Sequence, residues 1–234
     1  MTHIFKSAIF ALALAVFMSG CSGEPDAAVS KVTIEALHIT SFPETIDKNC
    51  RGGKAKIYDE CSDQAKLFAQ ARGRAQAEGK IVLVSYGAEW CIWCHVFEAY
   101  IHGDVEKFTY TFGEAGDDAR YTHTMRERAK RDVSQEAYDL KKYVSDNFVV
   151  AHIDYEHSPD GDDVLSQAGA WENFSGGVPY IFTVNETGTF AAEFDHDAAE
   201  VRRDTDDWYR GYDRAQLLKQ LKAMHAAASG GVED

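Results

Sequence analysis

The pattern of hydrophobic and polar positions predicts strands and helices alternating along the chain. Residues 81–84 and 148–153 are unbroken apolar runs, which are typical of strands buried on both faces of a parallel sheet. Residues 62–78 carry apolar side chains at helical spacing, and Gly79 follows them as a helix-ending residue. Residues 31–40 alternate between apolar and polar positions, as a first strand does. This order is typical of an α/β fold.

Further elements follow from the same patterns and from turn residues. Two strands joined by a turn at 185–188 are expected over 180–184 and 189–194. Asp213 is a suitable N-cap for a final helix that runs to about residue 225. The other expected helices span 91–101, 117–130, 134–145 and 164–171, and the expected loops span 43–61, 156–163 and 195–212.

Residues 1–20 are typical of an export signal, and Cys21 of a lipid-anchor site. The apolar run 8–17 is too short to cross a bilayer core of about 30 Å. The segment that ends in Cys21 resembles the lipobox of bacterial lipoproteins, in which this cysteine is the lipidated first residue of the mature chain. An ordinary signal peptide with an incidental cysteine is the alternative. By the same resemblance, Ser22 after the lipidated cysteine points to an anchor in the outer membrane, with the protein in the periplasm. Residues 21–30 are then the expected tether between the anchor and the folded part.

Charge and cysteine count narrow the possible functions. The chain of 234 residues carries 38 Asp and Glu against 24 Lys and Arg, for a net charge of −14. This balance argues against nucleic acid as a partner, because phosphate binding needs clustered basic residues. Five cysteines are present. If Cys21 carries lipid, an even number remains, which suits disulfides in an oxidising compartment.

Cys91 and Cys94 form a Cys-x-x-Cys pair between a predicted buried strand and a predicted helix. At a helix start, unsatisfied backbone N–H groups and the helix dipole favour negative charge. The pKa of the first thiol is therefore expected to fall from about 8.5 into a range of about 3.5–7.5. As a thiolate, Cys91 can attack a disulfide, and Cys94 can resolve the mixed disulfide that results.

These residues resemble the active site of the thioredoxin superfamily. Residues 88–94 match its cysteine motif, Gly177-Val178-Pro179 matches its cis-proline element, and 185–188 matches the turn that follows. The resemblance covers about 62–155 and 164–226. It is greatest to periplasmic thioredoxin-like domains of disulfide reductases and their lipoprotein relatives, and implies a thioredoxin fold, with a central mixed sheet flanked by helices.

The resemblance also implies roles for individual residues. Cys91 is the expected nucleophile and Cys94 the expected resolving thiol. The expected substrates are protein thiols and disulfides, with a redox partner protein and without a cofactor. The peptide bond before Pro179 is expected to be cis, and Val178 to present a backbone edge to an extended substrate. The residues expected to contact the substrate are Trp90, Ile92, Trp93, Val178 and Pro179.

Three features depart from the family pattern. Ser85 stands where thioredoxins bury an aspartate that helps to deprotonate the resolving thiol, and Glu98 is either its substitute or a helix-surface residue. Ile92 and Trp93 separate the cysteines in place of Gly-Pro, so the redox potential and the direction of electron flow stay open. The long separation of the cysteines from the proline element implies a helical insertion at about 104–140, which is either a decorative cap or a lid or partner surface beside the active site.

Cys50 and Cys61 lie in a glycine-containing loop before the thioredoxin-like region. We expect them to form a structural disulfide, and the alternatives are electron relay to the other pair or a four-cysteine zinc site. The expected organisation is an N-terminal extension at 31–61, a thioredoxin-like domain at 62–226 and a flexible tail at 227–234.

Two other functions compete for the same motif. With His95 directly after Cys94, the motif also matches the attachment pattern of c-type haem, with His95 as axial ligand and Met125, Met224 or another histidine as a second ligand. The buried strand before the motif argues against this, and without haem His95 is expected to be exposed in the first helical turn. A thioredoxin-fold lipoprotein that binds partners without catalysis is the remaining alternative.

Acidic residues concentrate in two segments, 154–163 and 195–207. Neither matches the spacing of a calcium-binding loop, so no metal site is expected and solvated loops are the preferred interpretation. Acidic loops can still select basic partner surfaces.

Overall fold

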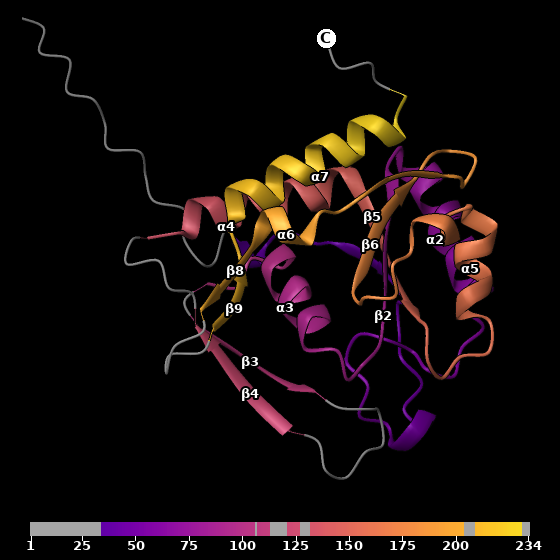
Figure 1. Ribbon diagram of the computed structural model, residues 1–234, viewed down its shortest axis with the longest axis horizontal. Helices are drawn as coiled ribbons and strands as arrows, with labels where there is room; N and C mark the ends of the chain where they lie inside the picture. The colour runs from indigo at the N-terminus through magenta and orange to yellow at the C-terminus, as the bar shows by residue number, and fades with distance from the viewer. Residues whose placement is uncertain (1–33, 106, 113–120, 127–131, 204–208, 231–234) are drawn as a thin grey trace, which may run out of the picture.

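The computed structural model describes residues 34–105, 107–112, 121–126, 132–203 and 209–230 (Figure 1). Its centre is a five-stranded sheet with the strand order β1-β5-β2-β6-β7. These strands are β1 (Thr40–Phe42), β2 (Ile81–Gly87), β5 (Phe148–Asp154), β6 (Tyr180–Val184) and β7 (Phe190–Glu193). β1, β5 and β2 run parallel to one another, and β6 and β7 continue the sheet with antiparallel pairing.

Helices cover both faces of this sheet (Figure 1). One face packs against α2 (Gln64–Glu78) and α5 (Gly161–Ala168), and the other against α3 (Ile92–Ile101), α4 (Ser134–Asn147) and α7 (Arg214–Ala228). Along β2, Val82 and Val84 pack in the core beside α2, while Leu83 packs in the core beside α3. Because both faces are buried, β2 is apolar at consecutive positions.

This architecture is the thioredoxin fold. A mixed sheet carries an antiparallel hairpin at one edge and helices on both faces, and the Val178-Pro179 peptide bond directly before β6 is cis. The expected α/β fold, the mixed central sheet and the cis proline are thereby confirmed. β1 comes from the segment expected to be an N-terminal extension, and it pairs with β5 as an edge strand of the sheet.

Local signals at the ends of helices act as the sequence predicts. Asp213 caps α7, since its side chain accepts a hydrogen bond from the Gln216 backbone N–H at 2.9 Å. Gly79 ends α2 in the left-handed conformation, with φ of 66°. Two short 3₁₀ helices, η1 (Cys50–Gly52) and η2 (Trp171–Asn173), complete the helical elements described so far.

The first strand does not lie where the alternating pattern of 31–40 predicts it. Ile34 lies in a short helical turn, which the Leu37 N–H closes by donating to the Ile34 carbonyl at 3.2 Å, and the strand spans only Thr40–Phe42. Ile34 and Ile39 are both buried. The apolar alternation therefore comes from two anchoring residues on either side of a turn, not from a continuous strand.

The insertion is not wholly helical, and the helix predicted over 117–130 is wrong at 121–126, the part of it that lies within the described residues. β3 (Lys107–Phe112) and β4 (Tyr121–Arg126) form an antiparallel hairpin that projects beside α3 (Figure 1), and α4 follows it. Threonine and aromatic residues alternate in both strands, and this strand preference outweighs the helical spacing of nearby charges.

The segment 195–212 is also more regular than the predicted loop. It contains α6 (His196–Ala199) and two strands, β8 (Glu200–Arg203) and β9 (Tyr209–Tyr212), which pair only with each other in the described part of the chain. The charged residues of β8 conceal the strand pattern, because a two-stranded ribbon needs no continuous apolar face.

Residues 1–30, which carry the predicted export signal, Cys21 and tether, lie outside the described residues. Among the helices that are described, none combines the length and the apolar character needed to cross a membrane. At the other end, α7 continues through Ala228, into the segment expected to be a flexible tail.

Candidate active site

The two cysteines of the Cys-x-x-Cys motif lie at the start of α3 and form a disulfide. β2 ends at Gly87, and the chain then turns so that Cys91 becomes the N-cap of α3. The Cys91 Sγ atom accepts a hydrogen bond from the Cys94 backbone N–H at 3.1 Å. This sulfur therefore faces the N–H groups of the first helical turn, which stabilise negative charge.

Side chains from three parts of the chain enclose this disulfide. Cys91 is 2% exposed and Cys94 is 1% exposed. The residues that pack around the pair are Ile57, Tyr58, Trp90, Trp93 and Val178. Three of the residues expected to contact a substrate are thus brought to the disulfide, while Ile92 is half-buried at the first position of α3 and Pro179 is buried before β6.

Ile57 and Tyr58 are site residues that sequence reasoning missed. Both come from the segment assigned to a loop before the thioredoxin-like region, about 30 residues before the motif, and both are buried. An apolar pair ahead of an acidic pair in an otherwise polar loop is the one signal that marks them.

Tyr58 brings a hydroxyl group to the end of β2 beside the disulfide. Its side chain is fully buried, and its hydroxyl lies 3.0 Å from Ser85 Oγ. Gly87 leaves room for this arrangement, because a Cβ atom there would lie 2.6 Å from Tyr58 Oη and 2.7 Å from Cys94 Sγ. Ser85, which departs from the family pattern, is thus the hydrogen-bond partner of a tyrosine from outside the motif.

A buried carboxylate joins this N-terminal segment to the motif. Glu89 is fully buried, and its Oε2 atom accepts hydrogen bonds from the backbone N–H groups of Ile57 at 3.0 Å and Tyr58 at 3.3 Å. Its Oε1 atom lies 3.7 Å from His95 Nε2. The segment that covers the disulfide is therefore held by the residue two positions before Cys91.

His95 does not have the exposed position expected for it. The side chain is 5% exposed, and its Nε2 atom lies 2.7 Å from the Glu89 carbonyl oxygen. The ring turns inward because the carbonyl and the carboxylate of Glu89 provide polar partners beneath the helix start.

Glu98 is neither a plain surface residue nor isolated. One of its oxygens lies 2.9 Å from His102 Nε2 and the other lies 3.4 Å from His152 Nε2, on β5. Burial alone would raise the pKa of Glu98, but His152 and His102 in their protonated forms outweigh it and lower that pKa from its ordinary value of 4.5 to about 2. Because burial lowers the pKa of His152 itself, His102 is the partner that stays charged to higher pH. The carboxylate also raises the pKa of His102, against the effect of burial.

These shifts predict a pH dependence of stability. A lowered carboxylate pKa stabilises the fold above about pH 4.5, and this contribution is lost as pH falls towards 2. A raised histidine pKa stabilises the fold below about pH 6.5, and this contribution is lost as pH rises through the raised value. The free-energy advantage of the wild type over Glu98→Gln should therefore be largest at about pH 5–6.5 and shrink by up to about 3 kcal/mol towards pH 2.

Urea unfolding of both proteins at a series of pH values measures this advantage. Glu172→Gln is a matched control, because Glu172 is exposed and should give no such profile. An advantage of Glu98 that stays constant from about pH 2 to 6 would show that its charge does not stabilise the fold.

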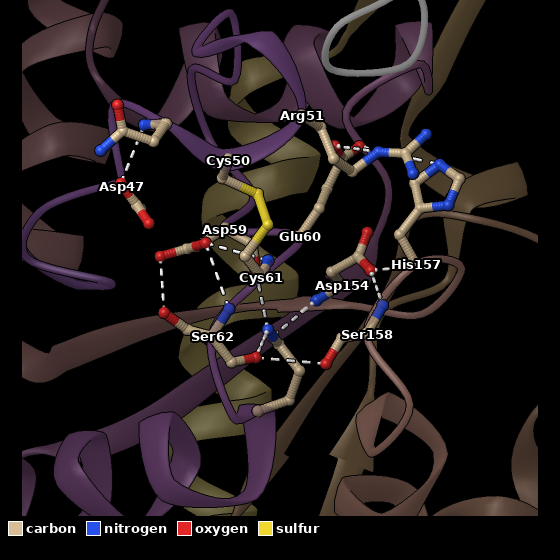
Figure 2. The surroundings of a disulfide bond; sticks show 12 residues. Asp47, Cys50, Arg51, Asp59, Glu60, Cys61, Ser62, Asp154, His157 and Ser158 are labelled. Atoms are coloured by element: carbon tan, nitrogen blue, oxygen red, sulfur yellow. Dashed lines mark hydrogen bonds and ion pairs between the residues drawn. A yellow bond between two sulfur atoms is a disulfide. The ribbon is translucent and has the colours of Figure 1, made fainter.

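The second disulfide joins Cys50 to Cys61 (Figure 2) and closes the segment that carries Ile57 and Tyr58. Glu60, fully buried at its side chain, lies 3.1 Å from Arg51 Nε, and this pair bridges the two ends of the segment. Cys50, Asp59 and Cys61 place possible ligand atoms within 4.8 Å of one another. Both sulfurs are already bonded to each other, and Cys91 and Cys94 are bonded likewise, so the alternative of a four-cysteine zinc site does not fit.

Removing this disulfide should destabilise the folded protein. The two cysteines are 11 residues apart in the sequence. For a crosslink that closes a loop of this length, the chain-entropy model gives a stabilisation of about 2–3 kcal/mol. Guanidinium unfolding of the Cys50→Ser/Cys61→Ser variant, with Cys91 and Cys94 kept oxidised, should show a loss of this size. An unchanged unfolding midpoint would mean that the ion pair and Glu89 hold the segment without it.

The acidic segment after β5 is only partly solvated, which corrects the expectation for it. Asp154 is fully buried, and its carboxylate accepts backbone hydrogen bonds from His157 and Ser158, both at 2.8 Å. Burial raises the pKa of Asp154, and these hydrogen bonds offset part of that rise. Within the described ranges, neither acidic segment brings three carboxylates within 4.8 Å of one another.

Comparisons with known proteins find solved structures of low similarity only. No family model matches the chain, and no curated protein does. The chain is similar to a solved structure titled "DsbH Oxidoreductase", with 12% identity, a TM-score of 0.39, and coverage of 87% of this chain and 94% of that one. It is also similar to the oxidised C-terminal domain of DsbD from Neisseria meningitidis, with 15% identity, a TM-score of 0.34, and coverage of 70% and 97%. The thioredoxin fold assigned above rests on the chain's own topology.

Proposed function

We propose that the protein is a thiol–disulfide oxidoreductase that acts on protein disulfides through Cys91 and Cys94. The observation that carries the proposal is the disulfide between these residues at the start of α3, with Cys91 as the N-cap. A thiolate at Cys91 is stabilised by the backbone N–H groups of the first helical turn. Cys94 lies within bonding distance of Cys91, so it can attack the mixed disulfide and release the bound substrate.

Substrate contact is proposed at the residues around the pair. Val178 packs against the cysteine cluster, and the two residues before it, Gly176 and Gly177, are exposed. An extended substrate segment can pair with this backbone edge as an added strand. Trp90 and Trp93 are half-buried and pack against the same cysteine cluster, and Ile92 adds half-buried apolar surface at the first position of α3.

The proposed location is the periplasm, with a lipid anchor at Cys21 and the outer membrane as its site. The signal-like residues 1–20 and the lipobox resemblance support this part of the proposal. Two disulfides among the described cysteines suit an oxidising compartment. A redox partner protein would return the Cys91–Cys94 pair to its starting state after each turnover.

The geometry of the site bears differently on the two alternatives, a c-type haem protein and a binding module without catalysis. Covalent haem needs both thiols of the motif for thioether bonds and a free His95 nitrogen, whereas the thiols are joined and His95 Nε2 lies against the Glu89 carbonyl. A binding module without catalysis is favoured by one observation, the 2% exposure of Cys91. Covering side chains must move before any external thiol or disulfide reaches this sulfur.

Trapping of a mixed disulfide separates an enzyme from a binding module. The reduced Cys94→Ser variant should accumulate a covalent complex with oxidised insulin, because no second thiol can release the substrate from Cys91. Non-reducing electrophoresis detects the complex, and Cys91→Ser is the matched control. Equal amounts of complex for the two variants would contradict the proposal.

A further inference from the structure

The Tyr58 hydroxyl lies beside the buried sulfur of the disulfide, at a place where the proposed reaction needs stabilisation of charge. Gly87 is the common neighbour: a Cβ at this glycine would touch Tyr58 Oη at 2.6 Å and Cys94 Sγ at 2.7 Å. The missing side chain thus keeps open the space in which the hydroxyl and the sulfur face each other. Tyr58 lies between Cys50 and Cys61 in the sequence and so comes from the crosslinked N-terminal segment, not from the strand and helix that carry the cysteines.

The Tyr58 hydroxyl keeps its proton at every pH at which the thiols titrate. Burial raises the pKa of Tyr58 far above its ordinary value of 10, and the hydrogen bond with Ser85 offsets only part of that rise. The group therefore acts as a hydrogen-bond donor and not as a base. Its oxygen can accept a hydrogen bond from the Ser85 hydroxyl, which leaves the tyrosine's own O–H group available to donate to another acceptor.

The sulfur of Cys94 changes from a weak acceptor to a strong one during the reaction. In the disulfide it is neutral, and the tyrosine hydroxyl lies with Ser85. As a thiolate it is an anion in a buried site, where a hydrogen-bond donor has its greatest effect. The hydroxyl must turn toward this sulfur, which lies on the other side of the space left by the absent Gly87 side chain.

We propose that Tyr58 is a positioning residue for the resolving step. Its hydroxyl donates a hydrogen bond to the Cys94 thiolate and accepts one from Ser85, so the three residues form a hydrogen-bonded chain. This inference rests on the proposed oxidoreductase function. Glu89 and the Cys50–Cys61 disulfide hold the segment that places the tyrosine. The N-terminal segment is then part of the active site and not only a crosslinked appendage.

The step balances without any further reactant. Cys94 first loses its proton to water, and the resulting thiolate is held by Tyr58. The thiolate then attacks the Cys91 sulfur of the mixed disulfide, so that the Cys91–Cys94 bond forms and the bond from Cys91 to the substrate sulfur breaks. The substrate sulfur leaves as a thiolate and takes up a proton from water, while Tyr58 keeps its own proton throughout.

Other charged and titratable groups face the same region and set the background against which Tyr58 acts. They come from the segment between β2 and α3, from α3 itself and from β5. These groups are Glu89, His95, Glu98, His102, His152 and Asp154. Since all of them stay in place in the variants below, a change in Cys94 titration reports on the tyrosine alone.

The pH dependence of Cys94 alkylation tests this inference. In the full chain carrying Cys91→Ser, a short pulse of iodoacetamide at a series of pH values, followed by peptide mass spectrometry, gives the midpoint of Cys94 reactivity. Adding Tyr58→Phe should raise this midpoint by about one pH unit, since a phenyl ring fills the space but donates no hydrogen bond. Ser85→Ala should raise it by less, because the donor remains.

Tyr86→Phe is the matched control, since Tyr86 is an equally buried tyrosine of β2 that packs in the core beside α2 and donates its hydroxyl hydrogen bond to Asp162 on α5. It should leave the midpoint unchanged. An unchanged midpoint in Tyr58→Phe, or a larger shift in Ser85→Ala than in Tyr58→Phe, would overturn the role of Tyr58. If Tyr58→Phe fails to fold, the shift in Ser85→Ala decides, and no shift there overturns the inference.

Failure of the inference can be told apart from failure of the proposed function. A wild type that forms mixed disulfides with insulin, together with an unshifted midpoint in Tyr58→Phe, contradicts only the tyrosine role. In the wild-type cysteine background, Tyr58→Phe should also lengthen the lifetime of the mixed disulfide near pH 7 and match the wild type at high pH. A lifetime that is longer by the same factor at every pH would indicate a structural defect instead.

Discussion

Replacing Cys91 with serine is expected to lower the rate of dithiothreitol-driven insulin reduction by at least about a hundredfold. A serine hydroxyl stays protonated near neutral pH, so it supplies no anion to attack a disulfide. Serine is also a good N-cap, and Cys91 already occupies that position in α3. The fold is therefore retained, and the loss measures chemistry.

The turbidity of precipitating insulin chains gives the rates of wild type and variant. Gln167→Ser, an exposed change on α5, controls for handling and should leave the rate unchanged. A folded Cys91→Ser protein that keeps most of the wild-type rate would favour the non-catalytic binding module.

Replacing Glu89 with alanine is expected to lower the free energy of unfolding by about 3–5 kcal/mol. The change leaves two buried backbone donors, the N–H groups of Ile57 and Tyr58, without the carboxylate that accepts from them. It also takes away the charge that lies 3.7 Å from His95 Nε2. Denaturant unfolding monitored by circular dichroism measures the loss.

Two further variants separate these effects. Glu89→Gln keeps an oxygen that can accept from the backbone, so it should cost less than Glu89→Ala. Glu172→Ala removes an exposed glutamate and should change stability by no more than about 0.5 kcal/mol. If Glu89→Ala behaves like Glu172→Ala, the carboxylate does not hold the N-terminal segment over the disulfide.

The sequence predicts those features of the fold that short local patterns encode. The apolar runs of β2 and β5 are strong signals because these strands are buried on both faces. The helix start at Cys91 and the cis bond before Pro179 follow from short motifs. The hairpin of β3 and β4 was missed because charges at helical spacing obscured its alternating threonine and aromatic residues.

The parts of the site that depend on contacts distant in the sequence could not be predicted. Tyr58 reaches Ser85 across 27 residues and Glu89 across 31 residues, and its own neighbourhood is polar and contains glycine. Glu89 has the charge of a surface residue, and only the fold shows that it is buried beneath the motif. The two halves of the site are joined by hydrogen bonds, which leave no periodic pattern in the sequence.

The redox potential of the Cys91–Cys94 couple tests the proposed function most directly. The protein is equilibrated in glutathione and dithiothreitol buffers, and the free thiols are alkylated and identified by mass spectrometry. The couple should titrate between about −120 mV, the value of a strong oxidant, and about −270 mV, that of a reductant, while Cys50–Cys61 stays oxidised. A Cys91–Cys94 bond that remains closed below about −300 mV would mark it as a second structural disulfide and contradict the proposed function.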